Sequence, residues 1–469
     1  MRFFAFWGFI KMNILIVGNG FDLSHYLPTK YDHFMVAMNA IEKWDETRGN
    51  MTFDDVFCSL YEQEAYFFKY TKSIYDTTQI VLISDDIRKI KIRLENNIWY
   101  KYFKFYRSRT ETWIDLEKKI EEGLECCSNF FELIGNKINE NSKISYMYKE
   151  LSQRSDSGSV KLHSRDIHIL SLLRILCIKR LVSSEPIFQW ADIDFPKGLY
   201  TLQSSDRRII NNDFMSENGG YMTYDYDKAI NHLYENLEDF IFLFNFYLIS
   251  FVNSLNSNEN NFKKLECNPD YVYSFNYSKT IERLYRGLSS INYLHGKSDE
   301  EESKLVLGIS DLNASFLKKY KAYGFTKYHQ KLLKKTDYIF LEFNEKIVKN
   351  SLQWNLWDIK RFSVESLEVN HRTNIFIWGH SLDISDDVYI SEVFSLNYND
   401  EDKNVRVVVY YFNEQANFDL LANLIHILGK EKVELWMKKG WLKFEKNPDI
   451  AKINDIEPVE LPRMIAQAS

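Results

Sequence analysis

The sequence predicts an α/β protein in which a parallel, Rossmann-like sheet carries a large helical insertion. Short apolar runs alternate with helix-like segments near both ends of the chain, a pattern typical of parallel sheets. The first run, residues 13–17, ends at Gly18-Asn19-Gly20 and leads into a helix-permissive segment. Between these regions, helical periodicity dominates. We expect a sheet core from residues 12–34 and 270–430, a mostly helical insertion at residues 35–269, and a C-terminal extension at residues 431–469.

The individual elements follow from periodicity and turn residues. Residues 152–164 contain Ser-Asp-Ser-Gly-Ser and predict a flexible linker. The segment after Lys430 gives no clear pattern. Apolar or β-branched runs predict strands at residues 271–276, 291–294, 304–309, 374–378 and 405–412. Apolar residues three and four apart predict helices at residues 31–44, 113–141, 162–182, 228–255, 330–350 and 418–428, and another through Val393 and Phe394.

Composition and charge limit the classes of function. The chain has 469 residues, of which 45% are hydrophobic, and a net charge of −7. These values are ordinary for a globular protein of two or three structural units. The negative charge argues against an extended nucleic-acid surface. The five cysteines form no CxxC pair, which argues against a four-cysteine zinc site and favours free thiols in a reducing compartment.

The apolar segments are too short to be predicted as membrane-spanning helices. The most apolar internal run, residues 240–252, is much shorter than the roughly 20 residues that a membrane-spanning helix needs. The leader MRFFAFWGFIK is apolar but short for a secretion signal. Either it packs on a surface, or Met12 is the functional start. We therefore expect a cytoplasmic protein with no membrane partner.

Small polar clusters follow the strands of the predicted core. In an open α/β sheet, ligands bind outside the carboxyl ends of the strands, and a Gly-x-Gly turn before a helix offers backbone N–H groups to a phosphate. Each cluster has an ordinary alternative, because Asn, Ser and Asp also cap helices and a histidine can occupy a turn. We expect one shared site because the clusters all fall at strand ends: Gly18, Asn19, Gly20 and Asp22; Asn276 and Ser278; His295 and Gly296; Gly379, His380, Ser381 and Asp383; and Asn413 and Glu414.

These motifs, taken in order, resemble the AbiH family of phage abortive-infection proteins. The resemblance rests on GNGFDLSHYLPTKYDHF near the N-terminus, followed by SFNYSKTIERLY, INYLHG and IFIWGHSLDISD in the C-terminal half. Within the insertion it rests mainly on Trp113-Ile114-Asp115-Leu116-Glu117. It implies a part in the response to phage infection.

The same positions show a more distant resemblance to the sirtuin-like NAD-binding fold. Gly18-Asn19-Gly20 stands where sirtuins have Gly-Ala-Gly, and SFNYS is similar to their Thr-x-Asn-x-Asp motif, with Ser278 in place of the Asp. His295-Gly296 resembles their His-Gly, and Gly379-His380-Ser381-Leu382 their Gly-Thr-Ser-Leu. The four zinc cysteines of protein deacetylases are missing. The resemblance therefore implies hydrolysis of NAD to nicotinamide and ADP-ribose rather than deacylation of lysine.

The resemblance also implies a role for each site residue. NAD is the expected substrate or ligand, with NADP and ADP-ribose as alternatives and no metal. Asn276 is expected to position the attacking water or the ribose hydroxyls, and His295 to act as general base. Asn413 is expected to contact adenine, and Asp22 either to bond to a ribose hydroxyl or to cap the next helix. The residues expected to bind the diphosphate and the ribose are Gly18, Asn19, Gly20, Gly379 and Ser381.

Other classes of function stay open. Gly379-His380-Ser381-Leu382-Asp383 comes close to the nucleophile elbow of serine hydrolases, with Ser381 as nucleophile, although Asp383 stands where the closing glycine should be. The same crevice could instead sense a nucleotide for a partner that kills the cell. A metal-dependent nuclease built on Asp383, Asp386 and Asp387 is a further alternative, but a solvated helix start explains these three carboxylates more simply. Because unregulated NAD loss would kill the host, we expect a phage-derived trigger or partner protein, with the insertion sensing it or forming a homo-oligomer.

Overall fold

The computed structural model describes residues 12–107, 112–140, 162–182, 185–188, 207–218, 221–257, 262, 265–285, 287–288, 290–300, 304–336, 373–397 and 405–462. The chain divides into two compact units. The sheet unit comprises Met1–Ser84, Asn245–Val306 and Gln330–Ser469, and the second unit comprises Asp85–Phe244 and Leu307–His329. This division differs from the expected one, because residues 35–84 and 245–269 belong with the sheet.

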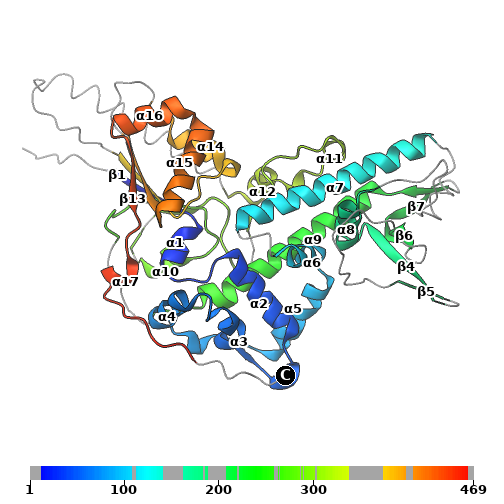
Figure 1. Ribbon diagram of the computed structural model, residues 1–469, viewed down its shortest axis with the longest axis horizontal. Helices are drawn as coiled ribbons and strands as arrows, with labels where there is room; N and C mark the ends of the chain where they lie inside the picture. Colours follow the sequence, from blue (N-terminus) through cyan, green and yellow to red (C-terminus); the bar gives the residue numbers. More distant parts are fainter. Residues whose placement is uncertain are drawn as a thin grey trace, which may run out of the picture. The chain divides into compact units, whose positions relative to one another are not determined.

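The sheet unit is built on six parallel strands (Figure 1). Their spatial order, β10-β9-β1-β11-β12-β13, is the 3-2-1-4-5-6 arrangement of dinucleotide-binding folds when the strands are counted along the chain. The winding direction reverses at β1, which pairs with β9 on one side and β11 on the other. In such folds the crevice at this switch point is the usual ligand site. The strands are β1 (Met12–Val17), β9 (Tyr271–Ser274), β10 (Ile291–Tyr293), β11 (Thr373–Trp378), β12 (Val405–Tyr411) and β13 (Leu442–Lys446).

Alternating strand residues form the core on one face of the sheet. Ile14 and Ile16 of β1 and Val407 of β12 point to this face and are buried. It is covered by α14 (Asp387–Val393), α15 (Glu414–Leu428) and α16 (Lys430–Lys438), which contribute Ile390, Leu424 and Trp436 among others (Figure 1). Leu15 and Val17 of β1 point to the opposite face and are also buried. Burial on both faces explains the continuous apolar run of this central strand.

The remaining elements of the sheet unit are short, and several begin with a side-chain cap. In α3, Thr52 and Asp55 form a capping box, which satisfies N–H groups at the helix start. Besides α3 (Phe53–Phe57), the unit contains α1 (Asn19–Ser24), α2 (Tyr31–Lys43), β2 (Met51–Thr52), α4 (Ala65–Ile74), β3 (Val81–Leu82), a π-helical turn (Leu248–Asn253), α10 (Thr280–Leu284) and α17 (Ile450–Ile453).

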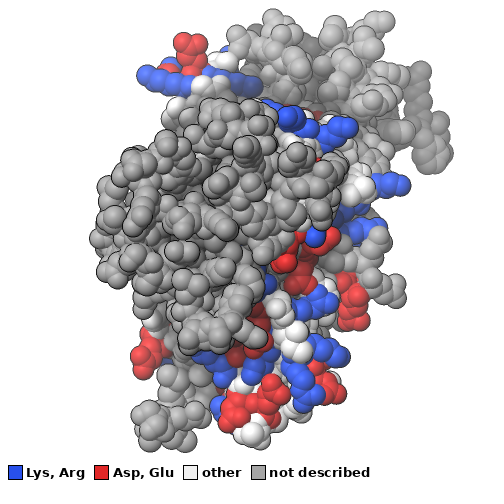
Figure 2. Space-filling view, turned by 90° about the vertical axis from the view of Figure 1, so that its right-hand side faces the viewer, with Lys and Arg blue, Asp and Glu red and all other residues white. Residues whose placement is uncertain are grey.

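The second unit combines helices with small antiparallel sheets. Its longest helix, α7 (Trp113–Glu140), packs on α8 and α11. At the end of α7 nearest Trp113, the buried Lys327 forms an ion pair with Glu117 at 2.7 Å. On the described surface in Figure 2, acidic and basic side chains are interspersed. The other elements are α5 (Ser84–Asn96), α6 (Ile98–Phe105), α8 (Ser164–Leu172), β4 (Leu176–Val182), β5 (Glu185–Phe188), β6 (Arg207–Ile210), β7 (Met215–Asn218), β8 (Tyr221–Tyr224) and α11 (Ser315–Lys319). Two helices begin in this unit and end in residues of the sheet unit: α9 (Tyr226–Tyr247) and α12 (Lys327–Lys334).

Three sequence predictions differ from the structure. The strand expected at residues 304–309 is wrong, since only Ile309 makes an isolated bridge, to Thr326. The helix expected over residues 162–182 ends at Leu172, and residues 176–182 form strand β4. The helix expected at residues 330–350 begins earlier, at Lys327, and ends at Lys334, whereas residues 337–350 lie outside the described residues. The predicted linker core and residues 1–11 lie outside the described residues.

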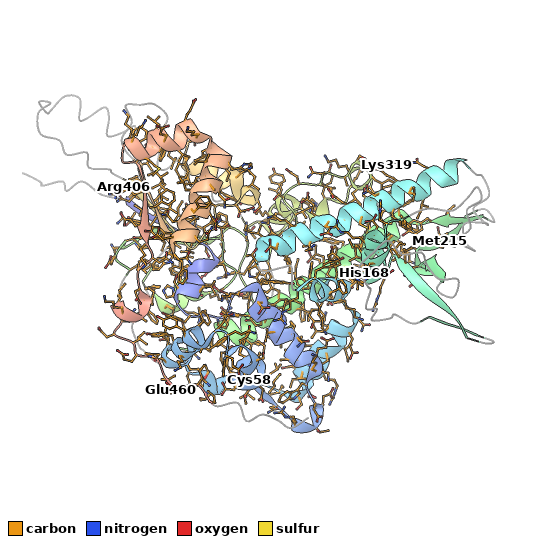
Figure 3. The ribbon with its side chains drawn as sticks, in the orientation of Figure 1. Cys58, His168, Met215, Lys319, Arg406 and Glu460 are labelled. Carbon is orange, nitrogen blue, oxygen red and sulfur yellow. The ribbon has the colours of Figure 1, made fainter. Side chains whose placement is uncertain are left out.

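The sheet continues past residue 430, in a segment for which no strand is predicted. Arg406 of β12, labelled in Figure 3, lies 3.5 Å from Glu445 of β13 across two paired strands. β13 is therefore part of the core rather than of an extension. All five cysteines are free, and Cys58, also labelled in Figure 3, is only partly buried.

Candidate active site

Two glycine turns meet at the centre of the sheet, where β1 and β11 end. Gly20 N–H donates to the Gly379 carbonyl at 2.8 Å, and Gly18 N–H donates to the Trp378 carbonyl at 3.0 Å. A Cβ on Gly18 would lie 2.6 Å from the Gly379 oxygen, and one on Gly379, at φ +71°, would lie 2.0 Å from the Phe21 nitrogen. Only glycine permits this backbone contact. Two of the three N–H groups expected to face a phosphate, those of Gly18 and Gly20, are thus engaged within the protein, and a nucleotide-binding role for Gly18, Asn19 and Gly20 stays a prediction.

A buried carboxylate lies beside this turn. Asp22 sits inside α1 rather than at its cap, so the capping alternative is wrong. Ser278 Oγ donates to Asp22 Oδ2 at 2.5 Å and lies 2.8 Å from Thr280 Oγ1. Burial raises the pKa of Asp22 to about 6, although the Ser278 and Thr280 hydroxyls and the nearby Asn276 amide oppose the increase. The hydroxyl of Ser278 thus brings the carboxylate of Asp22 to the loop that follows β9.

Asp22 and Asn276 also present unused polar atoms. Asp22 is 1% exposed and Asn276 is 6% exposed. Asp22 Oδ1 and Asn276 Nδ2 are buried, and neither makes a well-aligned hydrogen bond to a described residue. Leaving such an atom unsatisfied costs about 1–3 kcal/mol. One is an acceptor and the other a donor, so a ligand hydroxyl could satisfy both, since it donates and accepts.

A second buried cluster contains two histidines and one carboxylate. His295 Nε2 lies 3.5 Å from Asp386 Oδ1, and His380 Nε2 lies 3.4 Å from Asp386 Oδ2. All three side chains are less than one-tenth exposed. The Leu382 N–H donates to His380 Nδ1 at 2.9 Å. The expectation that Asp386 belongs to a solvated helix start is therefore wrong.

Phe275, at the end of β9, packs between the two histidines. Its ring centre lies 5.1 Å from that of His295 and 4.2 Å from that of His380. The Phe275 N–H donates to the Val17 carbonyl at the end of β1. A Cβ on Gly18, the next residue, would lie 2.6 Å from the His380 Cα. The glycine turns, Asn276 and His295 are therefore brought to the same end of the sheet, as the sequence predicts.

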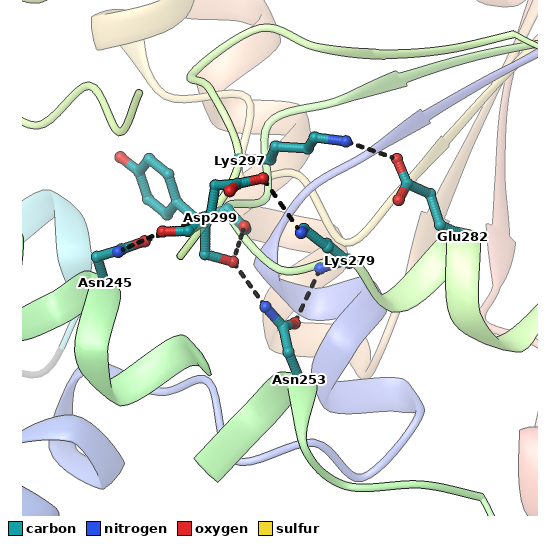
Figure 4. Close-up of polar contacts among 8 residues, drawn as sticks. Asn245, Asn253, Lys279, Glu282, Lys297 and Asp299 are labelled. Atoms are coloured by element: carbon teal, nitrogen blue, oxygen red, sulfur yellow. Dashed lines mark hydrogen bonds and ion pairs between the residues drawn. The ribbon is translucent and has the colours of Figure 1, made fainter. Parts of the chain in front are cut away.

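Hydrogen bonds from a π-helical turn fix the loops that carry Asn276 and His295 (Figure 4). Asn253, the last residue of this turn, accepts from Lys279 N–H and donates to Ser298 Oγ at 2.7 Å. Ser298 in turn donates twice to the Tyr277 carbonyl, through its N–H and its hydroxyl. One side chain thus ties the loop after β9 to the loop after β10. A π-helical turn at a helix end is frequent at functional sites.

Two predicted site residues lie on the surface. Ser381 is exposed, and its carbonyl accepts from Asn423 Nδ2. Asn413 is exposed and caps α15 by accepting the Ala416 N–H. Ser381 follows β11, which pairs with β1 at the switch point, and Asn413 follows β12, the next strand out. Their roles toward a ligand stay predictions.

The serine hydrolase alternative loses its geometric support. In a nucleophile elbow the serine occupies the strained position of the turn, whereas here Leu382 has the positive φ, at +54°. The neighbouring His380 uses Nδ1 for Leu382 and Nε2 for Asp386, so it does not serve Ser381 as a base. His426, the next histidine in the sequence, is exposed in the last turn of α15.

Sequence reasoning missed the inward direction of Asp386. Asp383 caps the 3₁₀ turn Ile384–Asp386 by accepting the Ser385 N–H, and this turn directs Asp386 into the protein. In the sequence, the signal for this inward direction is a capping residue, Asp383, followed three positions later by a second acidic residue, Asp386. The acidic residue next in line, Asp387, begins α14.

Two broader properties complete the description. Across the described ranges, every helix is too short or too polar to cross a lipid bilayer. Within the same ranges, His, Cys, Asp and Glu side chains do not gather in a set of three or more suited to a metal ion.

Comparison with known proteins identifies the family. A family model described as "Bacteriophage abortive infection AbiH" matches residues 14–177 and 189–411. These ranges include both glycine turns, Asp22, Asn276 and the His295–Asp386–His380 cluster. Searches of curated proteins and of solved structures find no match. Because the matched ranges cover most of the chain, this protein belongs to the AbiH family of bacteriophage abortive-infection proteins.

Proposed function

We propose that this protein is an abortive-infection effector that binds NAD at the carboxyl ends of its parallel strands and hydrolyses it to nicotinamide and ADP-ribose. Family membership supports the abortive-infection role. The strand order supports a dinucleotide site, because its switch point at β1 and β11 is where such ligands bind. The observation that carries the proposal is the buried, unsatisfied pair formed by Asp22 Oδ1 and Asn276 Nδ2.

This pair is suited to the ribose next to nicotinamide. A ribose hydroxyl would donate to Asp22 and accept from Asn276, which removes the cost of two buried polar atoms. With a pKa of about 6, the Asp22 carboxyl is about nine-tenths ionised at pH 7. Its negative charge would stabilise the positive charge that develops on the ribose as the bond to nicotinamide breaks.

The reaction needs one base and one water molecule. The bond between C1′ and the pyridinium nitrogen breaks with its electron pair going to nitrogen, so nicotinamide leaves as a neutral molecule. The water oxygen bonds to C1′, and its proton passes to His295 and then to solvent. Asn276 would hold the water or the ribose hydroxyl in line. Correct placement of a general base contributes about 10²–10⁴-fold in rate.

The other predicted residues would hold the rest of the dinucleotide. The diphosphate would lie against the start of α1, at Gly18, Asn19 and Gly20, and beside Gly379. The exposed Ser381 would contribute its hydroxyl, and Asn413 would contact adenine. These contacts would raise affinity without changing the chemistry of the reacting bond.

Hydrolysis must be gated, since NAD loss kills the host. We assign gating to a phage-derived trigger or partner protein and to assembly of a homo-oligomer in the cytoplasm. The second unit is the candidate for either task, because the residues of the proposed site all belong to the sheet unit. Mass photometry of the full chain, beside NAD turnover at each concentration, tests the assembly part. An active protein that stays monomeric throughout would contradict it.

The direct test is incubation of purified protein with NAD, NADP or ADP-ribose, with free nicotinamide measured by chromatography. His295→Ala and Asn276→Ala should each abolish NAD loss while leaving the fold intact. His426→Ala, which removes an exposed histidine, serves as the matched control and should keep full activity. Nucleotide affinity in calorimetry without nicotinamide release would instead indicate a sensing module that acts with a partner effector.

A further inference from the structure

The buried carboxylate of Asp386 lies between two imidazole rings. Asp386 Oδ1 faces His295 Nε2 at 3.5 Å, and Oδ2 faces His380 Nε2 at 3.4 Å. Asp386 is 8% exposed, and its chain position follows the cap at Asp383. A carboxylate this deeply buried needs donors on its oxygens. The two imidazole Nε2 atoms lie nearest to these oxygens, at distances and angles that do not make a hydrogen bond in this structure.

The tautomer of His380 follows from its other nitrogen. Leu382 N–H donates to His380 Nδ1, so this nitrogen carries a lone pair and the neutral ring holds its proton on Nε2. Nε2 is the His380 nitrogen that faces Asp386. Nε2 of His295 likewise faces Asp386, which favours the tautomer with its proton on Nε2 and with Nδ1 as the basic nitrogen.

We infer that Asp386, held by His380, is the positioning residue that fixes the ring and the tautomer of His295. Asp386 and His380 would not touch the substrate. The inference rests on the proposed function, in which His295 accepts a proton. When Nδ1 of His295 takes up that proton, the neighbouring carboxylate stabilises the imidazolium that forms.

The present separation is compatible with this role. At 3.4–3.5 Å, both contacts are longer than a normal hydrogen bond. In ligand-free enzymes such bonds are often long and shorten when the substrate binds. Two other titratable side chains lie close by: His380, on the second oxygen of Asp386, and Tyr277, whose ring centre lies 6.2 Å from that of His295. The Tyr277 hydroxyl donates to the Val306 carbonyl rather than to the histidine.

Nitrogen-15 NMR of histidine-labelled full-length protein tests the inference without relying on activity. His295→Gln and His380→Gln assign the two ring signals. In the unmodified protein, both neutral rings should show a protonated Nε2. In Asp386→Asn, the pH midpoint of His295 should fall by about one unit or more, because an opposite charge within about 6 Å is lost. Asp387→Asn, the same charge change one residue away, should leave the His295 midpoint unchanged.

Turnover gives the second readout. Asp386→Asn should lower kcat for NAD on the order of 10²-fold with little change in KM, and Asp386→Glu should restore part of it. An unchanged His295 midpoint in Asp386→Asn would overturn the inference, even if the unmodified protein hydrolyses NAD. A shifted His295 midpoint in a protein that releases no nicotinamide would support the positioning contact and contradict the proposed reaction.

Discussion

Replacing Asp22 with Asn should stabilise this protein at neutral pH while abolishing NAD hydrolysis. Burial raises the pKa of Asp22 to about 6 from an ordinary value of 3.8. Above about pH 6, the folded protein must hold a negative charge on the buried Asp22, whereas the unfolded chain exposes this charge to water. An Asn side chain has the same shape and no charge, and its amide can still bond to Ser278. Functional sites commonly sacrifice stability in this way.

The magnitude follows from the two pKa values. A raised folded-state pKa gives a contribution to stability that is complete below pH 3.8 and is lost as the pH rises through about 6. The full difference corresponds to about 3 kcal/mol. At pH 5 about half of it is lost, and above pH 7 nearly all of it. The gain in Asp22→Asn should therefore grow by about 1.5 kcal/mol between pH 5 and pH 8.

Hydrogen exchange of a peptide covering β1 measures this difference in the core of the sheet unit. The opening free energy of Asp22→Asn minus that of the unmodified protein should be positive and should increase from pH 5 to pH 8. Asp419→Asn, which removes an exposed carboxylate on α15, should give a small difference at both pH values. A difference for Asp22→Asn that is negative at pH 8, or independent of pH, would refute the reasoning.

Three further outcomes are expected. Gly379→Ala should lower the free energy of unfolding, measured by urea titration, by more than about 3 kcal/mol, because the new Cβ would overlap backbone atoms. Gly429→Ala, also at positive φ but with no atom within 4 Å of the new Cβ, should lower it by about 1 kcal/mol. Equal losses in the two variants would contradict this prediction. Asn253→Ala should lower kcat for NAD about tenfold by loosening both site loops, and unchanged nicotinamide release would exclude that role. Burial lowers the pKa of His25 to about 4. The free energy of unfolding should therefore fall by about 3 kcal/mol from pH 6.5 to pH 4, because the unfolded chain takes up a proton on His25. In the same exchange assay, His25→Gln should show a smaller fall in the free energy of unfolding over this pH range.

The central strands could be predicted because a strand that is buried on both faces has a mostly apolar sequence. β1, β11 and β12 are continuous apolar runs that end at glycine or Asn, and each is found within one or two residues of its expected bounds. β13 was missed because it lies at the sheet edge. Its sequence, LKFEK, buries mainly Leu442 and reads as a polar segment.

The candidate site could be predicted in its members but not in its contacts. Asn276 and His295 follow adjacent strands, and parallel pairing alone brings them to one edge. The bond from Ser278 to Asp22 joins residues 256 positions apart, and local periodicity carries no information about it. The inward turn of Asp386 depends on a single cap. The burial and the contacts of these two carboxylates therefore could not be predicted from the sequence.

The most direct measurement is nicotinamide release from NAD by the purified full-length protein, compared with Asp22→Asn, Asn276→Ala and His295→Ala. Turnover by the unmodified protein and its loss in all three variants, with β1 still protected from exchange, is the predicted result. Turnover that persists in the variants at the unmodified rate would show that the carboxyl ends of β1, β9 and β10 do not form the active site.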